Sequence, residues 1–314
     1  MTDRRLNTIT WAIVTCLLWS TAYPFIKIGL QYSTPLHFAG SRFVLAGLMI
    51  LPFTVRPKLY IRMIRENLSL ALWVTLLQVI INYVLFYIGM DIVPGAIGAV
   101  IVGSQPFVTA IVSRIMIKDE RFTRAKVLTI ILGIAGIVLV SLGRQQFNFG
   151  GKLELLGIVI IFIANISTAT SNVLISRNGK NMNPLVLSSF SIFTGGVIIF
   201  ILSLIFEDVP SGPVYPAKYR IVLVWLAFMS AFTFSRWYIL LNRPEVRVSE
   251  LNLWKFIIPV FGAILSWIIV PGEKPDWVTI TGMIIISLSL IYFFGVTGRR
   301  ERKSEEVPAG PMAK

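Results

Sequence analysis

Long apolar runs without charge constrain this chain more than any other feature. Residues 129–143 read TIILGIAGIVLVSLG and residues 280–296 read ITGMIIISLSLIYFFGV, with no charged side chain in either run. A helix needs about 20 mostly apolar residues to cross the core of a bilayer. Only 14% of the residues are charged and the mean hydropathy is +0.78, whereas a typical soluble domain carries about 25% charged residues. The chain is therefore predicted to be an all-α, polytopic membrane protein.

Ten apolar segments of this kind can be counted. They are predicted near residues 8–30, 36–55, 68–90, 94–117, 125–143, 153–175, 184–206, 220–241, 247–270 and 277–297. The first segment follows two arginines, as a signal peptide does, but it continues through TAYPFIKIGL without a small-x-small cleavage site. We therefore expect a retained first span. The single cysteine, Cys16, cannot form an intrachain disulfide and is predicted to be a packing residue.

The placement of basic residues predicts the orientation, because cytoplasmic loops are rich in lysine and arginine. With the N-terminus inside, 19 of the 29 basic residues fall on the inner side, 5 on the outer side and 5 within spans. Both termini are thus expected in the cytoplasm of a multi-pass protein of the inner (plasma) membrane. The net charge of +14 then reflects topology, and no nucleic-acid partner is expected. The expected partners are the lipid bilayer and a small-molecule substrate, with the protein a monomer or a homodimer.

The two halves of the chain resemble each other. Residues 106–140 align without gaps on residues 259–293, and residues 34–47 align on residues 183–196. Each repeat has five spans, which is an odd number, so the second copy must enter the membrane from the opposite face. Secondary transporters that work by alternating access are built in this way. We expect three parts, which are a first five-helix repeat at 1–147, a second, inverted repeat at 148–298 and a cytoplasmic basic tail at 299–314.

The motifs within this repeat resemble the drug/metabolite transporter superfamily, specifically its ten-span EamA-type permeases. They are LLWSTAYPFIKIGL in span 1, the arginine of RFVLAG in span 2, and proline, apolar run, glutamate and glycine-containing apolar run in each half. Gly136 and Gly282 each match one glycine of the family pattern, and each half lacks the other's glycine. The resemblance implies an inner-membrane permease, often an exporter of amino acids or other small metabolites. It also implies a central cavity lined by spans 1, 3, 4, 6, 8 and 9, with spans 5 and 10 at the periphery.

Polar and aromatic residues near the middle of spans are candidates for a substrate pathway, because polar groups at that depth are costly and usually face a cavity or a partner. The predicted pathway residues are Trp19, Gln78, Asn82, Gln105, Asn165, Ser230, Trp237, Trp254 and Lys255. The alternative for each amide is a hydrogen bond between helices, worth about 0.6 kcal/mol on average.

Five basic residues lie within the predicted spans, namely Lys27, Arg42, Arg114, Arg236 and Lys255. Lys27, Arg114 and Arg236 lie near enough to a span end to reach the headgroups, and Arg42 is a candidate for a structural pair. Lys255 is the deepest, and Pro259 frees its carbonyl from the usual helical hydrogen bond. We predict that Lys255 contacts an anionic group of the substrate. The alternative is a structural lysine that reaches a neighbouring carbonyl or the inner interface.

The functional expectation is a permease that moves small polar metabolites, amino-acid-like or anionic, by alternating access as an exporter, facilitator or exchanger. A transporter of a lipid-linked or phosphorylated substrate is the alternative, and a membrane-embedded enzyme or receptor is a third reading. With one histidine and no Walker loop, no catalytic residue, metal site or cofactor is expected. No carboxylate is predicted at the depth of Lys255, which favours facilitated diffusion or exchange over proton coupling.

Overall fold

The computed structural model describes residues 3–93, 101–117, 123–144, 152–208, 215–269 and 275–305, and these residues form helices with no strand among them. The α-helices are α1 Asp3–Ser20, α2 Ala22–Gly29, α3 Pro35–Ile50, α4 Pro57–Glu66, α5 Leu68–Val74, α6 Asn82–Ile92, α8 Gln105–Met116, α9 Arg124–Arg144, α10 Lys152–Asn178, α11 Pro184–Phe206, α12 Ala217–Leu241, α13 Val248–Leu253, α14 Ile257–Ile269 and α15 Trp277–Glu305. Short 3-10 turns occupy Leu51–Phe53, Gly179–Asn181 and Trp254–Phe256, and a π-helix occupies Thr75–Ile81.

The helices confirm an all-α polytopic membrane fold. Seven helices within the described ranges are long and apolar enough to cross a bilayer, and α8, α9 and α15 lie at the positions of the three other predicted spans. The span predicted at 184–206 coincides with α11, and that predicted at 68–90 with α5, the π-helix and α6. Of the span predicted at 94–117, residues 94–100 lie outside the described part of the chain.

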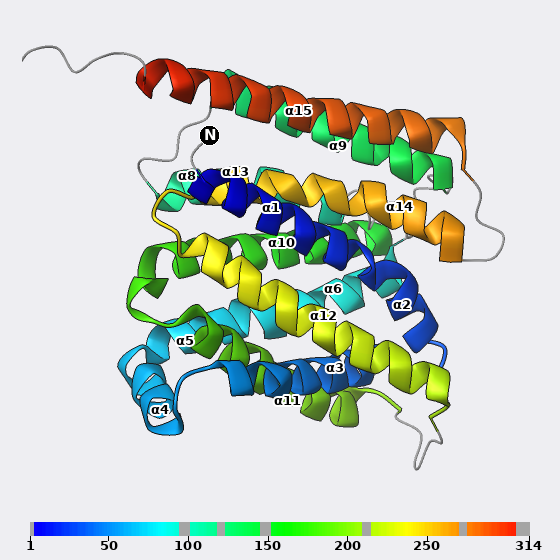
Figure 1. Cartoon of the computed structure of the whole chain (residues 1–314). Helices are drawn as coiled ribbons and strands as arrows, with labels where there is room; N and C mark the ends of the chain where they lie inside the picture. The colour runs from blue at the N-terminus through cyan, green and yellow to red at the C-terminus, as the bar shows by residue number, and fades with distance from the viewer. Residues whose placement is uncertain are drawn as a thin grey trace, which may run out of the picture.

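Two helix pairs occupy opposite sides of the bundle (Figure 1). α9 packs along α15 at one side, and α3 packs along α11 at the other. Glycine permits the close approach in the first pair, because a Cβ on Gly136 would lie 2.7 Å from the carbonyl oxygen of Gly282. In the second pair, a Cβ on Gly196 would lie 2.6 Å from the backbone nitrogen of Val44. Small residues of this kind let membrane helices approach each other closely.

The starts of the α3 and α11 helices are fixed by different acceptors. Each begins at a proline, whose missing N–H is not needed in the first turn. In α11 the side chain of Asn183 accepts a hydrogen bond from the backbone N–H of Leu185 at 2.9 Å. In α3 the acceptor is the carboxylate of Glu207, which receives the N–H groups of Leu36 at 2.8 Å and His37 at 3.0 Å. A carboxylate at the start of a helix also interacts favourably with the helix dipole.

Four of the spans depart from regular α-helix in their interior, and one of these is the fourth, which turns at Ser104 directly before α8 begins at Gln105. The first breaks at Thr21 between α1 and α2, three residues before Pro24, which cannot donate to the preceding turn. The third contains the π-helix, a feature that often marks functional sites. The ninth passes through the 3-10 turn Trp254–Phe256 before α14 begins. Lys255 thus sits at an irregular turn, four residues before Pro259.

Two helical features lie outside the predicted spans. The segment between the second and third spans forms a short helix, α4, whose Ile64 is buried while Arg62 and Arg65 are exposed. The region predicted as a basic tail from residue 299 begins inside a helix, because α15 continues to Glu305. The rest of that tail, residues 306–314, lies outside the described residues.

Candidate functional site

Lys255 is buried, with 9% of its surface exposed. Its ammonium donates a hydrogen bond of 3.1 Å to Oε1 of Gln105, at the first residue of α8. Within the part of the chain that the structure describes, no carboxylate forms an ion pair with this lysine. A charged lysine at such depth costs about 2.5–3.5 kcal/mol by insertion scales, and a single amide oxygen offsets only part of that cost.

Two tryptophans complete the surroundings of this ammonium. Its nitrogen lies 4.8 Å from the ring centroid of Trp237 in α12 and 5.5 Å from that of Trp19 in α1. The two rings meet edge to face, with centroids 5.1 Å apart. The negative faces of aromatic rings attract a cation, so the site holds a positive charge without neutralising it. Four of the predicted pathway residues, Trp19, Gln105, Trp237 and Lys255, are therefore brought together from four different spans.

Two other predicted residues, Asn165 and Asn82, lie in contacts that α10 makes with neighbouring spans, and a third, Gln78, does not form such a hydrogen bond through its Oε1. Asn165 donates to the carbonyl of Ile101 at 2.5 Å, and Asn82 accepts from the hydroxyl of Thr168 at 2.8 Å. Gln78 lies within the π-helix and is buried, and its Oε1 has no hydrogen-bond partner. For Asn82 and Asn165 the contacts match the alternative expectation of hydrogen bonds between helices. None of the three contacts Lys255 through a hydrogen bond.

The last two predicted residues lie on α12 and at the irregular turn. Ser230 is buried on α12, two turns before Trp237, and its hydroxyl has no partner, as is also true of Nε1 of Trp237. Trp254 is partly buried and directly precedes Lys255 in the 3-10 turn. A buried donor without a partner is costly, so the hydroxyl of Ser230 and Nε1 of Trp237 are suited to a ligand.

The other intramembrane cations differ in their surroundings. Arg42 is buried over the rings of Phe43 and Tyr83. Arg236 is half-buried, with its guanidinium carbon 4.2 Å from the ring centroid of Trp11. Arg114 is exposed near the end of α8, and the side chain of Lys27 lies outside what the structure describes.

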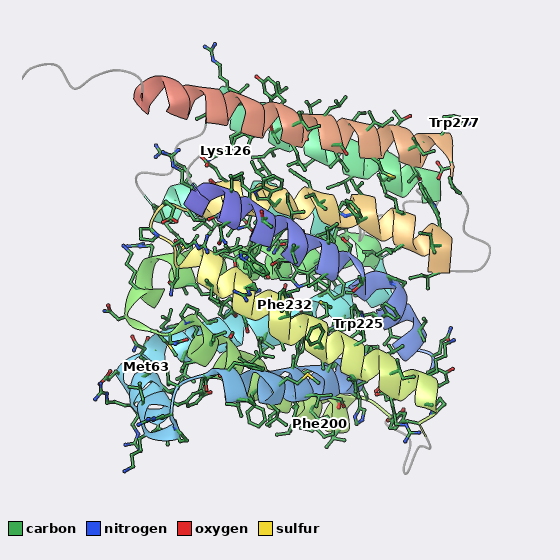
Figure 2. All side chains as sticks on the ribbon, viewed as in Figure 1. Met63, Lys126, Phe200, Trp225, Phe232 and Trp277 are labelled. Atoms are coloured by element: carbon green, nitrogen blue, oxygen red, sulfur yellow. The ribbon has the colours of Figure 1, made fainter. Side chains whose placement is uncertain are left out.

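Sequence reasoning missed a polar cluster at the end of the bundle where α13 begins, near the labelled Lys126 in Figure 2. Lys126 of α9 is 2% exposed, and its ammonium donates to the hydroxyl of Ser249 at 2.6 Å. Oε1 of Glu250 lies 4.0 Å from Nζ of Lys126 and 3.3 Å from Nη1 of Arg247. The cluster ties the fifth span to the ninth. The signal was weak because the sequence places Lys126 at a span end, where a lysine usually reaches water.

A second missed contact is a buried pair of asparagines. Asn172 of α10 donates to Asn252 of α13 at 3.3 Å, and Asn252 donates in turn to the carbonyl of Val248 at 2.8 Å. Asn252 lies two residues before the irregular turn that carries Lys255. The pair therefore connects the sixth span to the segment that positions the lysine.

Comparison with known proteins supplies the context for this site. The model of the EamA-like transporter family matches the chain twice, over residues 6–142 and 155–295. Among curated proteins, the uncharacterized transporter YvbV of Bacillus subtilis is 24% identical over 275 residues, covering 87% of both chains. A probable amino-acid metabolite efflux pump of Escherichia coli is 25% identical over 305 residues, covering 94% of this chain and 97% of the relative.

A shorter stretch matches the uncharacterized inner membrane transporter YedA of Escherichia coli, with 30% identity over 190 residues, 60% of this chain and 59% of the relative. A solved crystal structure also superposes on this fold with a TM-score of 0.76 and 17% identity, covering 94% of this chain and 99% of that one. At that identity the likeness shows the fold alone.

Proposed function

This chain belongs to the EamA-like transporter family, and from that premise we propose that it is a permease for small polar metabolites with an anionic group, such as amino-acid-like solutes. It works in the inner membrane by alternating access, as an exporter, facilitator or exchanger rather than as an enzyme. Both termini lie in the cytoplasm, and the two five-helix halves are inverted copies of each other.

One observation carries this proposal. Lys255 keeps a buried ammonium beside an amide oxygen and two indole rings, with no ion pair to a carboxylate among the described residues. Intramembrane ionisable residues generally mark substrate or ion pathways. An anionic group of the substrate would supply the missing negative charge, and the unpartnered Nε1 of Trp237 could donate to the same group.

The mode of coupling follows from the acidic residues. Glu250 is engaged with Lys126 and Arg247, and Glu207 caps the start of α3. Neither carboxylate is in hydrogen-bond contact with Lys255, so these contacts support facilitated diffusion or exchange over proton coupling.

The experiment is an uptake panel in proteoliposomes containing the purified protein, with protein-free liposomes as the control. Labelled L-glutamate, succinate, glycerol 3-phosphate and mannitol, which carries no anionic group, are compared with and without an imposed pH gradient. We expect saturable uptake of a carboxylate solute that is nearly insensitive to the gradient. Uptake of mannitol alone, or no uptake of any solute, would contradict the proposal. Preference for glycerol 3-phosphate would instead favour the phosphorylated-substrate alternative.

A further inference from the structure

Arg42 presents the same electrostatic problem as Lys255 in another part of the bundle. It is 3% exposed, and its Nε and Nη1 atoms are buried without a hydrogen-bond partner. A guanidinium carries five N–H donors and stays charged, so unpaired buried nitrogens are costly. The half-buried Arg236 does not share this feature, although it makes a similar ring contact.

The described neighbours of Arg42 are aromatic. Its guanidinium carbon lies 4.3 Å from the ring centroid of Phe43 and 5.7 Å from that of Tyr83 in α6. No described carboxylate forms an ion pair with it, and Glu207 uses its two oxygens on the start of α3. The hydroxyl of Tyr83 also forms a side-chain hydrogen bond with this guanidinium. Nε and Nη1 remain without a partner, so two N–H-bearing atoms are still available to an oxyanion.

A continuous series of aromatic contacts joins Arg42 to Lys255. We call it the aromatic series, and it consists of Tyr83, Phe43, Phe234, Trp19 and Trp237. Successive ring centroids are 4.4, 6.3, 5.9 and 5.1 Å apart, which is the usual range for interacting rings. Arg42 contacts the first two rings, and Lys255 contacts the last two. The two buried cations thus lie at opposite ends of one packed set of side chains.

The two cations also lie near opposite ends of the bundle. Figure 1 shows α3 beginning at the end where α2 finishes, and α13 beginning at the other end. Arg42 lies seven residues into α3, and Lys255 lies seven residues after the start of α13. At 1.5 Å per residue, each is about 10 Å from its own end.

We propose that Arg42 is a second binding residue for an oxyanion, taking the carboxylate or phosphate group of an anionic solute near the end of the bundle where α3 begins. The planar fork of arginine suits two-point binding of such groups. Its nitrogens are enclosed in this conformation, so the solute reaches them when the helices rearrange. The inference extends the proposed function, in which Lys255 is the first anion-binding residue.

The test measures equilibrium binding of succinate and of inorganic phosphate by calorimetry, at constant ionic strength, to the full chain in phosphatidylcholine nanodiscs. Arg42→Gln should weaken binding of at least one probe by about tenfold or more, which corresponds to about 1.4 kcal/mol. The affinity of Arg42→Lys, which keeps the charge but not the planar fork, should lie between those of the wild type and Arg42→Gln. Arg236→Gln is the matched control, because it removes an arginine that also lies over aromatic rings, and it should bind as wild type.

The outcomes separate this inference from the proposed function. Weak binding in Lys255→Met together with normal binding in Arg42→Gln would overturn the inference alone. Weak binding in Arg42→Gln with normal binding in Lys255→Met would support it while removing the role of Lys255. If Arg42→Gln fails to fold, wild-type affinity in Arg42→Lys contradicts the two-point contact. Repeating the titrations with phosphatidylglycerol in the nanodiscs distinguishes a lipid headgroup from a soluble anion as the ligand of Arg42. If this lipid weakens binding of the probes to the wild type but not to Arg42→Gln, the assignment of Arg42 to a solute is overturned. Failure of wild type to bind either probe would also overturn it.

Discussion

Lys255 owes its charge-holding surroundings to residues from three other spans, and Gln105 is the one that meets it through a hydrogen bond. The amide oxygen accepts from the ammonium without cancelling its charge, whereas a carboxylate in the same place would neutralise it. The identity of residue 105 therefore decides whether Lys255 remains attractive to an anion. This relation between one side chain and one charge can be tested directly.

We predict that Gln105→Glu folds and inserts normally but transports the anionic solute at least about tenfold less well, equivalent to about 1.4 kcal/mol. The new carboxylate would form an ion pair with Lys255 in place of the 3.1 Å hydrogen bond and compete with the substrate. The measurement is uptake in proteoliposomes, with thermal unfolding as the check on folding. Wild-type uptake would show that the charge of Lys255 is not used.

The depth of Lys255 could be predicted from the sequence, because the spans and their midpoints follow from hydropathy. Its partners could not. Gln105 lies 150 positions away along the chain, and the two tryptophans come from α1 and α12. Similarly, Asn82 and Asn165 look the same in sequence as pathway residues, and only the packing of α10 shows their interhelical hydrogen bonds.

At the scale of elements, the irregular turn and the glycine contacts organise the bundle. Pro259 lacks a backbone donor, which predicts a disturbance of the helix at Lys255. The ninth span runs as a 3-10 turn at residues Trp254–Phe256, in agreement with that prediction. The π-helix around Gln78 carries no such proline signal and was not foreseen. Around the edge, α9 and α15 approach each other at Gly136 and Gly282.

We predict that Gly136→Ala lowers the stability of the protein by about 1–3 kcal/mol, because its methyl group would overlap the backbone of α15. The measurement is thermal unfolding in detergent. Gly295→Ala in α15 is the matched control, since a Cβ there meets nothing within 4 Å, and it should unfold like the wild type. Equal unfolding temperatures for both variants would show that the α9–α15 contact is loose.

We predict different thiol reactivity for two groups of single-cysteine variants in a Cys16→Ala background. Gln105→Cys and Trp237→Cys should react with a hydrophilic thiol reagent, and substrate should slow the reaction. Asn82→Cys and Asn165→Cys should react more slowly, because those positions lie in helix contacts. Equal protection by substrate at all four positions would instead extend the pathway to the third and sixth spans.

For the whole molecule, the proposed topology requires an odd number of crossings in each half. Reporter fusions after Arg144 and after Lys303 should therefore localise to opposite sides, outside for the first and inside for the second. This expectation rests on the loops of the predicted topology, whose basic residues are concentrated on one side of the membrane. Fusions that report the same side would remove the inverted repeat and the alternating-access scheme that depends on it.

The central claim is that the buried ammonium of Lys255 contacts the anionic group of the substrate, and the most direct measurement is transport by Lys255→Met. This variant keeps a long side chain but no charge, so it should insert and unfold like the wild type and take up the carboxylate solute no faster than protein-free liposomes do. Lys255→Arg should be partly active, and Arg236→Gln should transport normally. Full transport by Lys255→Met would contradict the account and leave Lys255 a structural lysine.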